Sequence, residues 1–291
     1  MTEPEIIAAH SLAELSAFLE ETGNKITAGG TEILSRPCSD AVKLIDISLL
    51  SELSVMREQD NRVEIGSCVT LEKIINSPMI LRTAPILVDA CCKIADEDVR
   101  RRATIGGNIA ECSPEADTIP ALMAMKAKIT IKTDSDIRET DADHFFLRAD
   151  KYGIKPGEVI TKISFIKPKG QWGEAYCKLG IWKADPTIRF SGGAFLNMDE
   201  SCTIETSRIA VTAIHNKIVK CRSAEKILND HPADDELASK AADAVVKDCA
   251  DAVEENMADI QKKVLYDAFE QLLQLCMDQS VEKGLQNFSG E

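Results

Sequence analysis

Two segments with paired glycines constrain the local fold of this 291-residue chain more than any other feature. The first is AGGTE at residues 28–32, and the second is TIGGN at residues 104–108. Both follow apolar residues and carry hydroxyl or amide side chains beside the glycines. Glycine lets the backbone turn sharply and lets backbone N–H groups approach an anion closely. Both segments are expected to be turns, and two such turns facing each other would hold a pyrophosphate from two sides.

The same segments exclude two common phosphate sites and leave a simpler alternative open. Neither matches the GxGxxG pattern after a strand or a GK[ST] phosphate loop, so a Rossmann dinucleotide site and an NTPase are disfavoured. A single pair of glycines is also typical of an ordinary tight turn, and Asn108 is a common turn residue. The residues alone therefore support both a plain turn and a phosphate loop.

Composition and charge exclude several classes of protein. The net charge of −14 disfavours a nucleic-acid partner, because phosphates would repel the chain. A hydrophobic content of 44% supports a sizeable core. No apolar run approaches the length of a membrane span, and the acidic N-terminus does not resemble a secretory signal. Because no secretory signal is expected, the ten cysteines are interpreted as reduced cytoplasmic thiols. They form no CxxC pair, which argues against a metal site on this chain.

Hydrophobic periodicity predicts an α+β chain. A helix is expected from Ser11, with Glu14 completing a capping box. The later part reads as short strands joined by turns, which indicates an antiparallel sheet, followed by long amphipathic helices. A boundary is expected near residue 170, in the Pro/Gly-rich segment KPKGQWG. The strands expected from the pattern include 42–48, 62–70, 128–133, 159–168 and 206–214.

Several motifs together resemble one known family. AGGTE and ATIGGN stand about 75 residues apart and are followed by SPEADTIPALMAM, GEVITKISFIKP, YCK and RSAEKIL. This series resembles the FAD-binding medium subunit of the molybdenum hydroxylases, the family of xanthine dehydrogenase, carbon monoxide dehydrogenase and nicotinate dehydrogenase. The likeness extends over nearly the whole chain.

The resemblance implies a fold and a domain organisation. It implies a two-subdomain FAD-binding fold of the vanillyl-alcohol-oxidase (PCMH) type, followed by a C-terminal α+β domain with a small antiparallel sheet and helices. The FAD-binding domain would span residues 1–170, with subdomains of about 1–55 and 56–170. The C-terminal domain would span residues 171–291.

The resemblance also implies which residues bind FAD. One group would wrap the pyrophosphate through backbone N–H groups, and a second group would close on the phosphates from the other side. Asp117 would bond a polar group of the flavin or ribose, Ile163 would contact the cofactor through its backbone, and the positive charge of Lys178 near the flavin would favour its reduced anionic form. The two phosphate-binding groups are Ile26, Thr27, Ala28, Gly29, Gly30, Thr31, Glu32 and Ile33, and then Thr104, Ile105, Gly106, Gly107 and Asn108.

Each of these residues also has a simpler interpretation. Asp117 fits the cap of the helix that follows it, Lys178 fits an exposed lysine, and Ile163 fits a core position. The arginines at residues 100–102 suggest phosphate binding, but acidic residues at 96–98 favour local charge pairing.

The function implied by the resemblance is electron transfer within a complex. A molybdopterin large subunit would oxidise the substrate, a small subunit with [2Fe-2S] clusters would carry the electrons, and FAD on this chain would pass them to an acceptor such as NAD. No residue of this chain is expected to act catalytically on the hydroxylated substrate. The alternatives are a stand-alone flavin oxidoreductase of the same fold and a scaffold subunit that has lost FAD.

Overall fold

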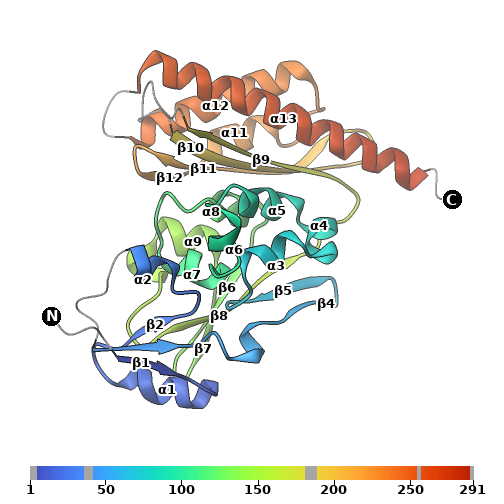
Figure 1. The fold of residues 1–291 in the computed structure, drawn as a ribbon. Helices are drawn as coiled ribbons and strands as arrows, with labels where there is room; N and C mark the ends of the chain where they lie inside the picture. The colour runs from blue at the N-terminus through green and yellow to red at the C-terminus, as the bar shows by residue number, and fades with distance from the viewer. Residues whose placement is uncertain (1–4, 36–41, 181–188, 254–256, 289–291) are drawn as a thin grey trace. The chain divides into compact units, whose positions relative to one another are not determined.

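The computed structural model describes residues 5–35, 42–180, 189–253 and 257–288. The chain folds into two compact units (Figure 1). Unit 1 comprises Met1–Leu81, Ile94–Cys112 and Ala127–Ile166, and unit 2 comprises Arg82–Lys93, Ser113–Lys126 and Lys167–Glu291. Each unit therefore contains segments that are separated in sequence. The domain limits of 1–170 and 171–291 remain a prediction.

A small parallel sheet begins unit 1. Its strands β1 (Glu5–Ala8), β3 (Lys43–Asp46) and β2 (Lys25–Thr27) lie in the order β1-β3-β2. Ile45 of the central strand pairs with Ile7 on one side and Ile26 on the other, and its side chain is fully buried. The sheet places the end of β2, where the first glycine segment begins, beside the end of β3.

The larger sheet of unit 1 is antiparallel and has the order β4-β5-β8-β6-β7. Its central strand β8 pairs with β5 and β6, so the segments that follow these strands are anchored to one framework. The strands are β4 (Met56–Gln59), β5 (Arg62–Gly66), β6 (Lys128–Lys132), β7 (Ile137–Asp141) and β8 (Val159–Ile166). The helical segments are α1 (Leu12–Glu20), α2 (Thr31–Ser35), η1 (Ser51–Leu53), α3 (Leu71–Ile75), α6 (Glu97–Arg100), α7 (Ile105–Ala110), α9 (Ala142–Leu147) and α10 (Ala149–Tyr152), and α4 (Pro78–Thr83) crosses the sequence limit at Leu81.

Unit 2 is an antiparallel sheet, ordered β12-β11-β10-β9, with helices on both faces (Figure 1). Adjacent glycines on β10 show the two faces: Gly192 lies against Phe269 of α13, and Gly193 lies against the backbone of Pro120 in α8. The strands are β9 (Gln171–Gly180), β10 (Arg189–Met198), β11 (Ile204–Ile214) and β12 (Lys217–Lys220). The helices are α5 (Pro85–Cys92), α8 (Thr118–Ala124), α11 (Arg222–Leu228), α12 (Asp235–Ala252) and α13 (Asp259–Phe288).

Local predictions from the sequence have mixed outcomes. The helix that starts after Ser11 is confirmed, because the Ser11 hydroxyl accepts the N–H of Glu14 at 3.1 Å. The prediction that the second glycine segment is a turn is wrong: α7 starts at Ile105, and Thr104 is its N-cap. Strand β1 and helix α2 are not predicted, since each has only four or five residues and no extended periodicity.

Glu174 is a buried carboxyl group in unit 2 that no sequence motif indicated. Its side chain accepts the backbone N–H of Ile86 at 2.8 Å, at the start of α5, and its own N–H donates to Gln279 of α13 at 3.0 Å. The residue is only 3% exposed. Burial raises the pKa of Glu174 to about 7, although its hydrogen bond from Ile86 and the charge of Lys283 oppose the shift. The folded chain therefore binds this proton more tightly than the unfolded chain does.

This shift predicts the pH dependence of stability. Because the folded pKa is raised, the stability contributed by protonated Glu174 is complete below its usual pKa of 4.5 and is lost as pH rises through about 7. Glu174→Gln keeps the acceptor for Ile86 without the ionisation. Relative to the wild type, the free energy of unfolding of this variant is expected to rise by up to about 3 kcal/mol between pH 4.5 and pH 8. Urea unfolding at both pH values measures this change.

Glu64 provides a control with the opposite sign. Although burial raises its pKa, hydrogen bonds from Lys162 and Arg57 hold the pKa of this carboxyl group below its usual value. Glu64→Gln should therefore lose stability relative to the wild type at pH 8. If the free energies of unfolding of the wild type and of Glu174→Gln differ by the same amount from pH 4.5 to pH 8, the raised pKa assigned to Glu174 is contradicted.

Candidate functional site

The first glycine segment presents unused backbone donors. It leaves β2 at Thr27, passes through Gly30 in the left-handed region (φ 67°), and enters α2 at Thr31. The backbone N–H groups of residues 28–31 form no hydrogen bond with the residues that the structure describes. A Cβ atom at Gly29 would stand 1.9 Å from the carbonyl oxygen of Arg102. Only glycine permits this contact, which holds the first segment directly beside the residues that precede the second.

The second glycine segment has already used its backbone donors. The N–H groups of Ile105 and Gly106 donate to the carbonyl oxygens of Val69 (3.0 Å) and Ser67 (2.9 Å). Those of Gly107 and Asn108 donate to the side chain and the carbonyl oxygen of Thr104, at 3.1 and 3.0 Å. The expectation that this segment offers free N–H groups is therefore wrong, because helix formation satisfies them. What it can offer a ligand is the hydroxyl hydrogen of Thr104 and a surface without side chains.

One cavity in unit 1 brings the two glycine segments together. Its volume is about 100 Å³, and it is lined by residues from both segments and from β8. Pockets for drug-sized ligands measure about 300–1,000 Å³, so this cavity fits one part of a dinucleotide. A Cβ atom at Gly106 would lie 2.5 Å from the Cβ atom of Ser67, and glycine is therefore required at this wall. The lining residues are Ile26, Ala28, Ile47, Ser67, Thr104, Gly106, Gly107, Ala110, Ile154, Val159 and Ile160.

The cavity contains some of the predicted residues and others that the sequence did not indicate. Ile26, Ala28, Thr104, Gly106 and Gly107 line it as a group. The lining residues without a sequence signal come from positions that read as ordinary strand or loop. Thr27 ends β2, and Thr31, Glu32 and Ile33 form the start of α2.

Ile163 and the arginines before the second segment have clear structural positions. Ile163 lies on β8 between Ile65 and Ile129 and is fully buried, as a core residue would be; its contact with the cofactor remains a prediction. Arg101 pairs with Glu97, as expected from the acidic residues at 96–98, whereas Arg100 pairs with the more distant Glu72 at 3.4 Å.

Arg102 differs from these two arginines. Its guanidinium nitrogen Nη2 lies 3.6 Å from where a Cβ atom at Gly30 would be. A positive charge therefore lies beside the N–H groups of the first segment, and both features favour a bound anion.

Asp117 is the centre of a hydrogen-bonded cluster in unit 2. Its carboxylate accepts from Lys178 Nζ (2.6 Å), Ser191 Oγ (2.7 Å) and Tyr176 Oη (3.2 Å), and its side chain is 8% exposed. Asp117 stands at the N-cap position of α8 but makes no capping hydrogen bond with its side chain. Its interpretation as a helix cap is therefore wrong. The sequence motif YCK contains two of the three partners, whereas nothing in the sequence indicated Ser191.

The charge of Lys178 is paired within this cluster. Lys178 Nζ also donates to the carbonyl oxygen of Lys93 at 3.0 Å, so it is fixed in place and is not an ordinary exposed lysine. Together, Asp117 and Lys178 have no net charge. Burial and the neighbouring Asp117 charge raise the pKa of Tyr176, which keeps its phenol protonated as a donor. The cluster therefore presents an ordered set of donors and acceptors.

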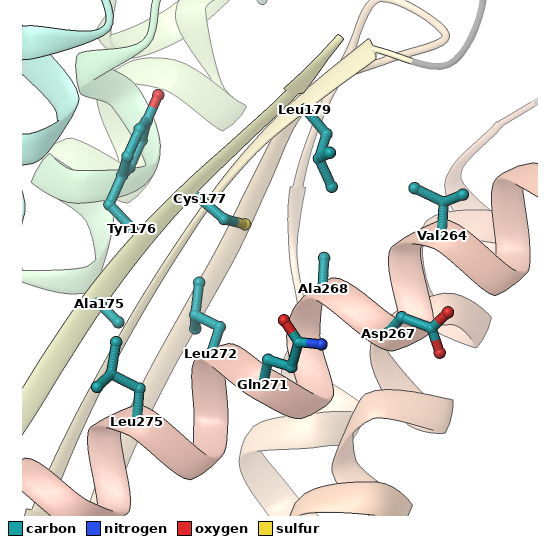
Figure 2. A pocket seen from close by; sticks show the side chains of 10 residues that line it. All are labelled: Ala175, Tyr176, Cys177, Leu179, Val264, Asp267, Ala268, Gln271, Leu272 and Leu275. Atoms are coloured by element: carbon teal, nitrogen blue, oxygen red, sulfur yellow. The ribbon is translucent and has the colours of Figure 1, made fainter. Parts of the chain in front are cut away.

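A second cavity, in unit 2, contains none of the predicted residues. It has a volume of about 400 Å³ and lies between β9 and α13 (Figure 2). Figure 2 shows Cys177 pointing toward α13 and Tyr176 pointing away from it, as alternating residues of a strand do. Its size alone would favour this cavity as a ligand site. The Asp117 cluster, however, lies on the opposite face of the sheet and does not face this cavity.

Metal clusters and membrane helices are both missing from the described part of the chain. Within it, no group of three or more His, Cys, Asp or Glu side chains is placed to hold a metal ion. Within the same residues, every helix is too short or too polar to cross a bilayer. Trp182, for which the sequence leaves open ordinary packing or a position over the flavin ring, lies outside the described residues.

Comparison with known proteins identifies the class to which this fold and site belong. Residues 2–167 match the model of the FAD binding domain in molybdopterin dehydrogenase. The chain is 30% identical over 248 residues to the carbon monoxide dehydrogenase medium chain of Hydrogenophaga pseudoflava, covering 82% of this chain and 84% of that one. It is 26% identical over 229 residues to the putative xanthine dehydrogenase FAD-binding subunit of Escherichia coli (strain K12), covering 77% and 78%.

Solved structures agree with the sequence matches. The structure of carbon monoxide dehydrogenase from Hydrogenophaga pseudoflava superposes with a TM-score of 0.82 at 26% identity, covering 97% of this chain and 98% of that one. The expected α+β fold, with an FAD-binding domain and a small antiparallel sheet, is confirmed. The protein is thus a flavoprotein subunit of an oxidoreductase, with FAD as its cofactor. It belongs to the family of FAD-binding medium subunits of the molybdenum hydroxylases.

The contacts of Asp117 predict its contribution to stability. Asp117→Ala removes the acceptor of the buried Ser191 hydroxyl and of the half-buried Tyr176 hydroxyl, and it leaves the Lys178 ammonium with only the carbonyl oxygen of Lys93. The free energy of unfolding should therefore fall by about 2–3 kcal/mol. Urea unfolding of the FAD-free chain measures this change. Glu115→Ala is the matched control: Glu115 is 51% exposed and pairs with Arg189 at 3.1 Å, so its loss should cost at most about 1 kcal/mol. Equal losses in both variants would contradict the role given to Asp117.

Proposed function

We propose that FAD binds with its diphosphate between the two glycine segments. The observation that carries this proposal is the cavity that residues of both segments line. The unused N–H groups of residues 28–31 and the Arg102 guanidinium supply donors and positive charge on one side. On the other side, the Thr104 hydroxyl and the bare surface of Gly107 allow close approach. Residues 26–33 and 104–108 form this part of the proposed site.

The proposed site also includes Asp117, Lys178 and Ile163. The ordered hydrogen bonds of Asp117 and Lys178 would hold a polar group of the flavin or ribose in a fixed orientation. Because their charges are paired, the pair supplies hydrogen bonds without adding net charge near the ring. The flavin supplies the redox chemistry when it is bound, and the protein binds it, orients it and sets its surroundings. No described residue is assigned a proton-transfer role toward a hydroxylated substrate.

We further propose that the chain works as one subunit of a three-subunit electron-transfer complex. Electrons would arrive from [2Fe-2S] clusters on a small subunit, after substrate oxidation at a molybdopterin on a large subunit, and would leave for an acceptor such as NAD. The names of relatives support the part of this proposal that makes the chain one subunit of a complex, since they include the nicotinate dehydrogenase FAD-subunit of Eubacterium barkeri and the nicotine 6-hydroxylase medium subunit of Paenarthrobacter nicotinovorans. A cytoplasmic location is part of the same proposal and rests on the sequence alone.

Flavin content tests the FAD site directly. Thr31→Arg places a long side chain at the start of α2, and Gly107→Asp places a carboxylate against the cavity, so both variants should lose most of their FAD. The measurement is FAD released by heat per purified chain, from its absorption spectrum. Thr22→Arg is the matched control, because Thr22 is an exposed threonine of unit 1 outside the cavity lining, and it should keep its FAD. Normal flavin in Thr31→Arg and Gly107→Asp would overturn the two-segment site.

Co-purification of the native protein separates the proposed complex from its alternatives. The proposal predicts two partner chains, molybdenum and iron together with FAD. A stand-alone flavin oxidoreductase would purify with FAD alone, and a scaffold subunit would purify with partners but without FAD. Either of these results would overturn the three-subunit proposal.

A further inference from the structure

Ser67 is held by its backbone beside the second glycine segment. It follows strand β5, and its N–H donates to the carbonyl oxygen of Thr161 at 3.0 Å. Its own carbonyl oxygen accepts the N–H of Gly106 at 2.9 Å. The Cβ atom of Ser67 lies against the bare face of Gly106, in the tight contact that excludes a side chain there. The side chain of Ser67 is therefore fixed over the first turn of α7.

The hydroxyl group of Ser67 is buried and unpaired. The residue is 3% exposed, and its Oγ atom forms no hydrogen bond of good geometry with the described residues. It does interact with the adjacent Cys68 thiol, whose pKa burial raises and Ser67 partly lowers. A buried hydroxyl group without a partner destabilises a folded protein, so a ligand that supplies a hydrogen-bond partner would remove this destabilisation. Ser67 also lines the cavity that it shares with Thr104 and Gly107.

Burial without a partner is not by itself the argument, because Thr130 and Thr212 also have unpaired buried hydroxyl groups. Neither of them lines the cavity between the glycine segments. Ser67 combines the unpaired hydroxyl with a position on the ligand side of the fold. It also lies where donors are scarce, since the backbone N–H groups of Ile105 to Asn108 are all used within the protein.

We propose that the Ser67 hydroxyl donates a hydrogen bond to the ADP half of FAD, at a diphosphate oxygen. Ser67 would then supply a donor on the side of the cavity formed by the second glycine segment, whose own N–H groups are used within α7. This assignment rests on the proposed function, because it requires FAD at the cavity. It makes Ser67 a cofactor-binding residue that none of the sequence motifs contains.

The test compares two variants of the full chain freed of flavin. Ser67→Ala removes the hydroxyl beside the cavity, and Thr130→Val removes an equally buried hydroxyl on β6. The dissociation constants of FAD and of ADP are measured by titration, and the melting temperature is measured without ligand. Ser67→Ala should weaken the binding of FAD and of ADP by the same factor, about threefold to tenfold, as expected for the loss of one neutral hydrogen bond. Its melting temperature without ligand should be unchanged or higher.

Thr130→Val should also melt at the same or a higher temperature and should bind both ligands as the wild type does. A structural role for Ser67 would instead lower the melting temperature of the ligand-free Ser67→Ala variant, and this result would overturn the proposal. Unchanged affinity for FAD in Ser67→Ala would overturn it and leave the FAD site intact. Weaker binding of FAD with unchanged binding of ADP would also overturn the proposal, because the hydroxyl group would then contact the flavin half of FAD. A wild-type chain that binds no FAD would overturn the proposed function as well.

Discussion

The contact between Gly29 and the carbonyl oxygen of Arg102 determines the arrangement of the candidate site. Any side chain at position 29 would overlap this oxygen, so the approach of the two segments depends on one missing Cβ atom. Once they are held together, the first segment keeps its N–H groups unused while the second folds into α7 and uses its own. The two glycine pairs therefore have different physical roles. The first exposes donors, and the second permits close packing of α7 on Ser67.

A similar dependence on one residue exists in unit 2 around Asp117. Its carboxylate joins α8 to β9 and β10 through three donors, and it pairs its charge with Lys178. Because a buried carboxylate requires partners, the position of Lys178 is determined by the fold as well as by any ligand. The two requirements agree, which explains how residues far apart in the sequence keep a fixed geometry before a cofactor is present.

Much of the fold could be predicted from the sequence, and the reasons for the failures are physical. The helix after Ser11 was predictable because its capping signal is local, and the antiparallel strands were predictable from short strand segments joined by turns. The helix α7 was not, because its glycines have low helix propensity and the helix depends on Thr104 as a cap and on contacts with Ser67. The partners of Asp117 were predictable only in part. Tyr176 and Lys178 belong to a recognisable motif, but Ser191 meets them only through strand pairing.

The order of the segments along the chain has a consequence for synthesis on the ribosome. Helices α5 and α8 belong to unit 2, but they are made before β8, which completes unit 1. All seven residues of α8 are buried, so this helix remains without its sheet until β10 and β11 have emerged. A nascent chain that stalls near Ile166, or a gene fragment cut there, would carry an apolar helix without its cover. Such a fragment is prone to aggregation or to capture by chaperones.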